Sequence, residues 1–362
     1  MTGKYNVRNY EAFGMLSREE VTFGQLLQAN GYATCIAGKW QLGKESDSPQ
    51  HFGFAHSCLW QHMAGAYASD GADSRYANPV MEYNGSTVEY SQREFGPDVA
   101  CDYIIDFLRK NEQKQPFLVY YPMILTHCPF VPTPDSNDWN AERSKTYNGN
   151  PAYFSDMVSY TDKLVGRLLN ELDRLGLTDN TLIIFTGDNG TDRTVTSQFN
   201  GKPYPGGKGK TIDSGVHVPL IISCPGGLKG CVNNNLIDFT DFLPTLCEAA
   251  SVSIPDSIQL DGKSFYPQLL GKQTEVREWV YCWYAPRDVD DKKAQVFARN
   301  HQYKLYRSGE FYNVSQDFEE KHPLSLLFLT EEQKKVYHTL KSVINQYNEI
   351  QRTVVRRKYT ID

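Results

Sequence analysis

Apolar runs and helix-like apolar spacing alternate along the first three quarters of the chain, which is the order typical of α/β domains with a parallel sheet. Short runs rich in aliphatic and β-branched residues predict strands at residues 32–37, 116–125, 181–185 and 220–224. Apolar positions three or four apart predict helices at residues 97–111, 151–175 and 239–250. A shorter helix is expected before residue 31, starting from a capping box at Ser17–Glu20.

Two other parts of the chain follow different patterns. Residues 44–96 have no sustained period, so we expect a long irregular insertion over the sheet. From about residue 277, short strand-like runs at 279–284, 294–299 and 303–306 predict a small antiparallel sheet, followed by a final helix at 331–351. We therefore expect a main domain over residues 1–275 and a smaller α+β subdomain over residues 276–362.

Composition narrows the class of protein. The 362 residues are 40% hydrophobic and 22% charged with a net charge of −6, which is ordinary for a globular protein and gives no basic field for nucleic acid. No apolar run reaches the length of a membrane span, and the first residues lack the apolar centre of a signal peptide.

Eight cysteines without a C-x-x-C pair argue against a zinc ribbon or a thioredoxin-type motif. Their pairing stays open.

The strand predicted at 181–185 leads into Gly187-Asp-Asn-Gly190. In an open parallel sheet the carboxyl ends of the strands line the binding crevice, so Asp188 and Asn189 are candidates for holding a hard cation such as Ca²⁺ or Mg²⁺. Asp-Asn-Gly is also good turn chemistry whatever the function, and on this stretch alone a turn is the simpler interpretation.

Other strand ends carry further polar groups. Lys39 and Gln41 follow the first predicted strand, His127 follows the second, and Lys208 lies in a glycine-rich loop that lacks the spacing of a phosphate-binding P-loop. Two lysines suit a tetrahedral dianion, a histidine suits proton transfer, and an Asp-Asn pair suits a divalent metal. This set favours hydrolysis of a sulfate or phosphate ester, whereas each group alone is as readily a surface residue.

Three histidines of the predicted insertion, at positions 51, 56 and 62, are weaker candidates for ligands. Histidines scattered in loops are more often surface polar groups.

In its ordered motifs the chain resembles the type I, arylsulfatase-like sulfatases of the alkaline phosphatase superfamily. The resemblance rests on Gly31-Tyr-Ala-Thr34 before Gly38-Lys-Trp-Gln-Leu-Gly43, Thr126-His-Cys-Pro129, Phe185-Thr-Gly-Asp-Asn-Gly190, and Gly206-Gly-Lys-Gly209 before Gly215-Val-His-Val-Pro219. These motifs occur in the family's order over about residues 1 to 275.

The resemblance implies an alkaline-phosphatase-like fold with a mixed, mostly parallel sheet flanked by helices. It implies that Lys39 and Lys208 hold the sulfate, that His127 contacts or protonates the ester oxygen, and that Asp188 and Asn189 bind Ca²⁺ rather than Mg²⁺. It also implies a sulfated small molecule or glycan as substrate and a periplasmic or extracellular location. The substrate itself and the oligomeric state stay open.

The chain departs from the family pattern in two places. The family's C-x-P-S-R motif, whose Cys or Ser becomes the formylglycine nucleophile, and two metal-binding aspartates lie upstream of a Leu-Thr-Gly-Arg-Tyr-like segment, whereas Met1-Thr-Gly-Lys-Tyr5 starts inside that segment. Gln41 stands where the family usually has His, and an amide cannot transfer a proton. The expectation is therefore an N-terminally incomplete and inactive sulfatase chain. A phosphoester hydrolase and a non-catalytic, sulfatase-like anion- or glycan-binding protein stay open as alternatives.

Overall fold

The computed structural model describes residues 1–350 except 61, 64, 66, 69, 70, 113, 140–144, 229 and 286–292. Its contacts group the chain into two compact units. One unit comprises Val21–Leu182, and the other comprises Met1–Glu20 together with Ile183–Asp362. The domain boundary predicted at residue 275 stays a prediction.

The unit Val21–Leu182 is built on a five-stranded mixed sheet in the order β4-β3-β2-β1-β5. Its central strand, β1 (Ala33–Lys39), pairs in parallel with β2 (His56–Trp60) and with β5 (Phe117–Tyr120). The strands β3 (Val80–Tyr83) and β4 (Ser86–Glu89) continue the sheet in antiparallel pairings. The middle of β1 is fully buried, so the predicted strand is confirmed and is the core of this unit.

The prediction of an irregular insertion over residues 44–96 is wrong. This segment contains the short helix α3 (Ser48–His51) and three of the five strands of the sheet, β2, β3 and β4. The strands are only four or five residues long, and β2 is buried at four successive positions, so no apolar-polar alternation marks it. The conformation of β2 is therefore decided by its pairing with β1.

The capping box predicted at Ser17–Glu20 is also wrong. Helix α2 spans Phe23–Ala29, and its capping box consists of Thr22 and Gln25. The Gln25 backbone N–H donates to the Thr22 hydroxyl at 3.3 Å, and the Thr22 backbone N–H donates to the Gln25 side chain at 2.9 Å. Both motifs have acceptable chemistry, but the buried Thr22 also bonds to the Phe52 carbonyl, which fixes the start of the helix.

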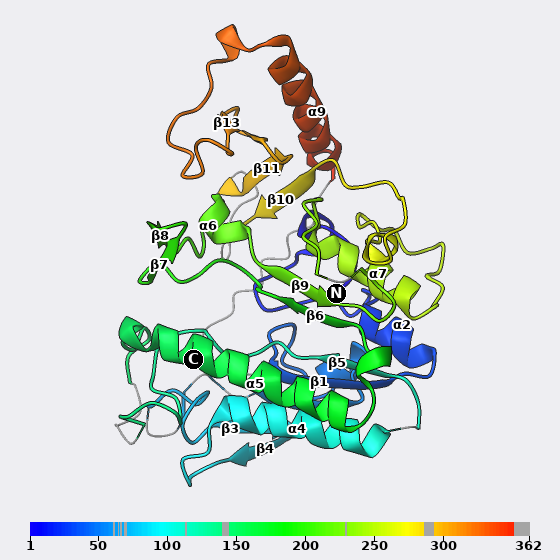
Figure 1. Cartoon of the computed structure of the whole chain (residues 1–362), viewed down its shortest axis with the longest axis vertical. Helices are drawn as coiled ribbons and strands as arrows, with labels where there is room; N and C mark the ends of the chain where they lie inside the picture. The colour runs from blue at the N-terminus through cyan, green and yellow to red at the C-terminus, as the bar shows by residue number, and fades with distance from the viewer. Residues whose placement is uncertain are drawn as a thin grey trace. The chain divides into compact units, whose positions relative to one another are not determined.

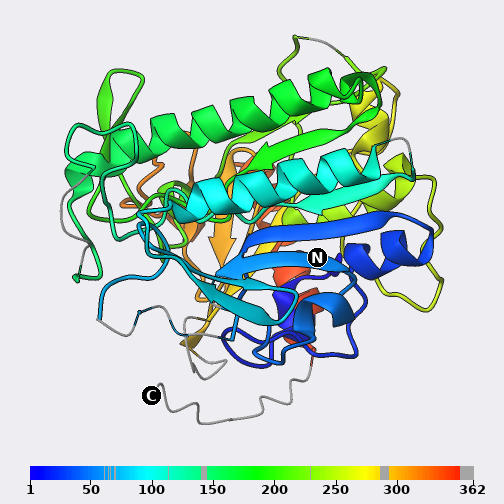
Figure 2. The ribbon, with the colours of Figure 1, turned by 90° about the horizontal axis from the view of Figure 1, so that it is seen from below.

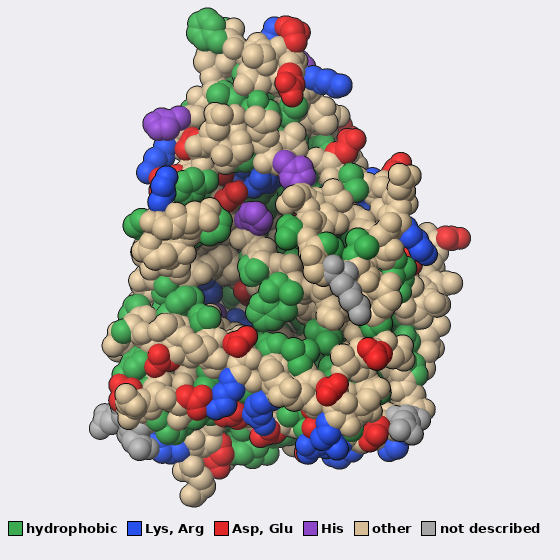
Figure 3. Space-filling view, in the orientation of Figure 1, with side chains coloured by type: hydrophobic (Ala, Val, Ile, Leu, Met, Phe, Trp, Pro, Cys, Tyr) green, Lys and Arg blue, Asp and Glu red, His purple; other side chains and the backbone are tan. Residues whose placement is uncertain are grey.

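Two long helices cover this sheet, as predicted. Helix α4 (Gly96–Asn111) lies against β1 and β2, and α5 (Phe154–Arg174) packs against α4 (Figures 1 and 2). A 3-10 turn at Pro151–Tyr153 precedes α5, and another at Thr178–Asn180 follows it. Acidic and basic side chains lie intermixed on the lower part of the face seen in Figure 3. Between the two helices, Arg167 pairs with Asp98 and Arg109 pairs with Glu171.

In the other unit, β6 (Ile183–Thr186) pairs in antiparallel fashion with β9 (Leu220–Ser223). Both strands were predicted, but β6 was expected to extend the parallel sheet. An apolar run specifies a strand without specifying the direction of its partner, and here the partner is β9. Between them lie the hairpin β7 (Thr196–Phe199) and β8 (Lys202–Pro205) and the short helix α6 (Asp213–Val216).

Short helices fill much of the rest of this unit. They are α1 (Asn6–Asn9), a 3-10 turn at Phe239–Asp241 leading into α7 (Phe242–Ala249), and α8 (Tyr266–Leu269). The helix predicted at 239–250 is thereby confirmed.

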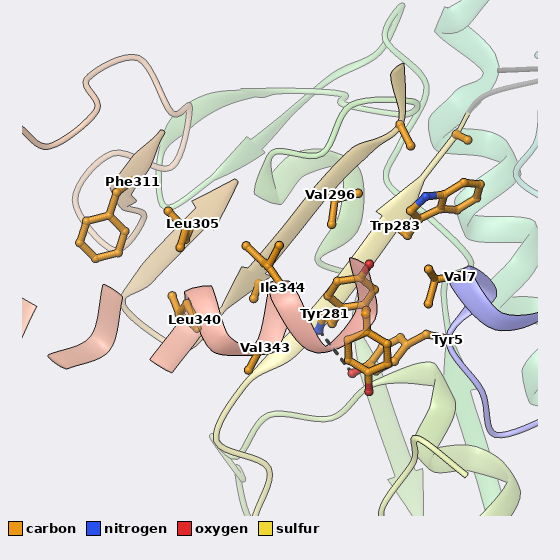
Figure 4. Close-up of a cluster of buried hydrophobic side chains, with 14 of the residues drawn as sticks. Tyr5, Val7, Tyr281, Trp283, Val296, Leu305, Phe311, Leu340, Val343 and Ile344 are labelled. Atoms are coloured by element: carbon orange, nitrogen blue, oxygen red, sulfur yellow. Dashed lines mark hydrogen bonds between the residues drawn. The ribbon is translucent and has the colours of Figure 1, made fainter. Parts of the chain in front are cut away.

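The C-terminal part of the unit forms the predicted antiparallel sheet, with four strands in the order β10-β11-β12-β13. Helix α9 (Glu331–Asn348) packs against β11 and β12 (Figure 1), and the predicted helix end at residue 351 lies outside the described residues. A cluster of buried side chains from these strands and from α9 includes Tyr5 and Val7 of the N-terminal segment (Figure 4). The strands are Val280–Tyr284, Gln295–Arg299, Tyr303–Tyr306 and Phe311–Asn313, and a 3-10 turn at Leu326–Phe328 precedes α9.

All eight cysteines are unpaired in the part of the chain that the structure describes. Burial raises the pKa of the Cys58 and Cys101 thiols to about 12, so both are un-ionised near neutrality. These cysteines act as small buried apolar groups. Across the described ranges, no helix combines the length and the apolar character needed to cross a membrane.

Candidate active site

Lys39 and Gln41 flank a tryptophan that anchors their segment. Lys39 is the last residue of β1, and both side chains are half-buried, whereas Trp40 is 2% exposed. The Trp40 ring packs near Phe52 and Phe54, with centroids 6.0 and 6.4 Å away, and its indole N–H donates to the Ser48 hydroxyl at 3.2 Å. The buried tryptophan therefore fixes the backbone from which Lys39 and Gln41 project.

The same strand end lies beside the segment that leads to His127. The Lys39 backbone N–H donates to the Pro122 carbonyl at 2.8 Å, just beyond the last residue of β5. Gly38 permits this approach, because a Cβ there would lie 2.1 Å from the same carbonyl oxygen. Parallel pairing of β1 with β5 thus brings Lys39, Gln41 and the His127 turn to one edge of the sheet.

His127 is held by a buried arginine that the sequence interpretation missed. An N–H of Arg75 lies 2.8 Å from His127 Nδ1, and the hydroxyl of buried Tyr76 donates to the His127 carbonyl. The Arg75 side chain forms an ion pair with Asp73 at 2.8 Å. Arg75 and Asp73 lie in the segment predicted to be irregular, and no motif there distinguishes them from surface residues.

Asp188, Asn189 and Lys208 belong to the other unit, where backbone bonds join their two segments. The Gly190 N–H donates to the Gly215 carbonyl at 2.9 Å, and the Lys208 N–H donates to the Thr191 carbonyl at 3.0 Å. The lysine loop is therefore tied to the chain two residues beyond Asn189. Asp188 is exposed, and Asn189 and Lys208 are half-buried.

The glycines around Lys208 are required by close packing. A Cβ at Gly206 would lie 2.0 Å from the Asp192 carbonyl oxygen, and a Cβ at Gly207 would lie 2.3 Å from the Ser214 hydroxyl. Such distances are far below van der Waals contact, so neither position accepts a side chain without movement. The loop is therefore packed against the chain at Gly206 and Gly207, next to Lys208.

A buried lysine on the C-terminal sheet fixes the chain just beyond this loop. Lys304 on β12 is fully buried and donates to the Thr211 carbonyl and, at 2.7 Å, to Glu320. Burial lowers the pKa of Lys304, and the Glu320 carboxylate opposes that effect. Arg299 pairs with Asp213 in the same stretch. The small antiparallel sheet thereby supports the Lys208 loop.

The two residues predicted to bind Ca²⁺ are too few for a complete site. Asp188 and Asn189 offer one carboxylate and one amide oxygen, whereas Ca²⁺ takes six to eight oxygen ligands. Within the described ranges no group of three or more His, Cys, Asp and Glu side chains is placed to hold a metal ion. The donors have the right chemistry for a hard cation, but their number does not fit a complete site.

The histidines of the 44–96 segment do not form a ligand cluster either. His62 is buried, with Nε2 2.8 Å from the Glu45 carbonyl and Nδ1 3.2 Å from Glu82. His56 is exposed and its ring lies 5.5 Å from that of Phe107. The prediction that such histidines are surface polar groups holds for the exposed His56 and is wrong for His62, which is 2% exposed.

The structure therefore places the six predicted residues in two sets. Lys39, Gln41 and His127 share one unit, and Asp188, Asn189 and Lys208 share the other. Within each set, segments far apart in the sequence meet through backbone hydrogen bonds. The chemical role of each residue stays a prediction.

Comparison with known proteins identifies the class. Residues 1–252 match the sulfatase family model, and residues 208–350 match the model described as N-sulphoglucosamine sulphohydrolase, C-terminal. The chain belongs to the sulfatase family. It is 31% identical to human arylsulfatase A over 314 residues and 30% identical to the uncharacterized sulfatase YdeN of Escherichia coli over 339 residues. These matches cover 81% and 86% of this chain but 59% of each relative, so the chain spans about three fifths of their length.

Solved structures show the same fold, the alkaline-phosphatase-like fold with a small C-terminal domain. Ps i-CgsB in complex with k-i-k-neocarrahexaose superposes with a TM-score of 0.76 over 96% of this chain and 80% of that chain, at 20% identity. BT4656 in complex with its substrate D-glucosamine-2-N,6-O-disulfate gives 0.71 over 96% and 87%, at 21% identity. A phosphonate monoester hydrolase from Silicibacter pomeroyi gives 0.64 over 96% and 83%, at 16% identity, so the fold alone does not separate sulfate from phosphorus ester chemistry.

Proposed function

We propose that the protein is a sulfuric ester hydrolase that removes sulfate from a sulfated glycan or an aryl sulfate. The observation that carries the proposal is the packed loop of Lys208, joined by its backbone to the segment of Asp188 and Asn189. A half-buried lysine on a fixed loop is preorganised for an oxyanion. Among the relatives, arylsulfatase A and N-acetylgalactosamine-6-sulfatase are named for aryl and glycan sulfates.

In this proposal each candidate residue has a separate task. Lys39 and Lys208 neutralise the sulfate oxygens, and the Gln41 amide donates a hydrogen bond to one of them. His127 donates a proton to the ester oxygen as the sulfur–oxygen bond breaks, so that the sugar or phenol leaves as a neutral alcohol. The family's nucleophile is a formylglycine made from the Cys or Ser of a C-x-P-S-R motif, and these 362 residues do not carry that motif.

We also propose that Asp188 and Asn189 contribute two ligands to a Ca²⁺ site. A bound Ca²⁺ would supply positive charge for the sulfate and nucleophile. The two donors present are too few for a complete Ca²⁺ site. Export to the periplasm or cell exterior is part of the same proposal, since sulfated glycans are met there.

The proposal is tested first on the 362-residue polypeptide. We expect no aryl sulfate turnover and Ca²⁺ binding weaker than micromolar, because one formal negative charge and two side-chain donors cannot replace the ion's hydration shell. Calorimetric titration with Ca²⁺ and an aryl sulfate assay measure both. Micromolar Ca²⁺ affinity or turnover would contradict the proposed ligand or nucleophile assignment.

The same assays on a polypeptide extended through a C-x-P-S-R or S-x-P-S-R motif should show aryl sulfate hydrolysis. Faster hydrolysis of aryl phosphate would favour the second candidate, a phosphoester hydrolase, which the likeness to a phosphonate monoester hydrolase keeps open. Binding of sulfated glycans without hydrolysis would favour a third candidate, a sulfatase-like binding protein.

Gln41→His in the extended polypeptide should raise turnover and add a pH dependence near neutrality. The reason is that an imidazole both hydrogen-bonds and exchanges a proton in this range, whereas the amide of Gln41 only hydrogen-bonds. A pH profile of kcat/KM for both forms measures the change, with Gln28→His on the exposed side of α2 as the control. An unchanged rate and profile would mean that Gln41 does not contact the sulfate.

A further inference from the structure

The contact between Arg75 and His127 bears on where the imidazole carries its proton. Arg75 is 4% exposed, and its guanidinium lies over the ring of Trp60, 4.3 Å from the centroid. The Arg75 Nε donates to both carboxylate oxygens of Asp73 at 2.9 Å, and another N–H of the group pairs with the same carboxylate at 2.8 Å. The Trp60 ring, the Asp73 carboxylate and the burial of Arg75 therefore hold its guanidinium in one orientation.

The remaining side of this guanidinium is turned to the His127 turn. The Arg75 Nη1 lies 2.8 Å from His127 Nδ1 and also donates to the Cys128 carbonyl. His127 Nδ1 is 2.5 Å from that same carbonyl oxygen. One arginine nitrogen, with two hydrogens, thus faces two neighbouring groups.

The chemistry of arginine decides between the two protonation patterns of the ring. A guanidinium N–H only donates, because the group has no lone pair to offer and stays charged at any physiological pH. The nitrogen that faces it accepts, so Nδ1 carries a lone pair. The Cys128 carbonyl is satisfied by the second hydrogen of the same Arg75 nitrogen, and the arginine keeps the two acceptors from repelling each other.

We infer that Arg75, oriented by Asp73, is the positioning residue of His127 and sets its tautomer so that the proton is on Nε2. Without the arginine, the nearest partner of Nδ1 is the Cys128 carbonyl, which accepts a hydrogen bond only from a protonated Nδ1. The proton then moves to Nδ1, and Nε2 becomes an acceptor. The inference rests on the proposed function in one respect: an Nε2 proton is what the acid of an ester hydrolysis donates.

Nuclear magnetic resonance on the 362-residue protein tests this inference without turnover. Long-range proton–nitrogen spectra of protein labelled with ¹⁵N-histidine distinguish a protonated from an unprotonated ring nitrogen, and His127→Gln identifies the His127 signals among the eight histidines. Near neutral pH, we expect the wild-type protein to carry the His127 proton on Nε2. A wild-type spectrum with the proton on Nδ1 overturns the inference directly, whether or not any variant folds.

Arg75→Met should move the His127 proton to Nδ1, with loss of the Nε2–H signal. Arg75→Lys keeps one donor but loses the two-pronged contact with Asp73, so we expect a mixture of both forms. Arg109→Met is the matched control, because Arg109 bonds to Glu171 on the helices and should leave the His127 signals unchanged. Arg75 variants that lose thermal stability but keep the proton on Nε2 would show a role in packing only and would overturn the inference.

The outcome is separable from that of the proposed function. An Nε2 proton that depends on Arg75 in a protein without sulfatase turnover, even when extended, leaves the positioning role standing and refutes the proposed function. Turnover in a protein whose His127 proton is on Nδ1 would refute the positioning role of Arg75 and leave the proposed function standing.

Discussion

Gly190→Ala should lower the free energy of unfolding by about 1–3 kcal/mol and displace the segment of Asp188 and Asn189. A Cβ at Gly190 would lie 1.9 Å from the Ser214 carbonyl oxygen, and the hydrogen bond from the Gly190 N–H to the Gly215 carbonyl holds the turn after β6 against α6 at this distance. The added methyl group cannot be accommodated without breaking that bond. Urea denaturation measures the loss.

Gly187→Ala is the matched control in the same turn. Its Cβ would meet Val218 at 3.5 Å, which is ordinary contact, and neither glycine has a positive φ. We therefore expect a change within about 0.5 kcal/mol. Equal losses for the two variants would mean that backbone flexibility, and not the close approach to Ser214, decides the effect.

Arg277→Met should destabilise the protein by about 3–5 kcal/mol. Arg277 is 6% exposed, and its Nε donates to the carboxylate of buried Asp241 at 3.0 Å while Nη1 donates to the Tyr5 hydroxyl at 3.0 Å. Methionine fills much of the space but leaves the Asp241 carboxylate buried without its cation. Chemical denaturation followed by tryptophan fluorescence gives the free energy.

Two further variants separate charge from packing. Lys263→Met removes a cation from an exposed pair with Glu275 and should cost no more than about 1 kcal/mol. Asp241→Asn in the Arg277→Met background should recover part of the loss, because the unpaired charge is then gone. No recovery would assign the effect to packing around Tyr5.

The sequence alone predicted the candidate residues and their motifs, because each motif consists of neighbouring residues that directly follow a predicted strand. Gly38-Lys-Trp-Gln41, Thr126-His127 and Gly187-Asp-Asn-Gly190 each follow a predicted strand, and those strands exist in the structure as β1, β5 and β6. Arg75 has no such signal. It lies in a segment without periodicity, and only the fold of β2 and β3 brings it to His127.

The sequence interpretation failed where pairing overrides local pattern. The strands β2, β3 and β4 were assigned to an irregular insertion, since they are short and lack alternation. The direction of β6 was likewise missed, because an apolar run such as Ile183–Thr186 buries equally well beside a parallel or an antiparallel neighbour. The capping box was predicted at Ser17 but lies at Thr22, whose hydroxyl also donates a hydrogen bond to the Phe52 carbonyl.

The sequence by itself determined the family motifs and the candidate residues Lys39, His127, Asp188 and Lys208, because the side-chain chemistry of a motif belongs to neighbouring residues. It also determined the long helices α4, α5 and α9, because their apolar period is a property of a continuous run of residues. Tertiary structure alone decided which strands pair, that the Lys208 loop is bound to the chain beyond Asn189, and that a buried arginine faces His127. Those outcomes depend on contacts between residues that are tens of positions apart in the sequence. The packing of the whole unit, and not any local run of sequence, decides whether such contacts form.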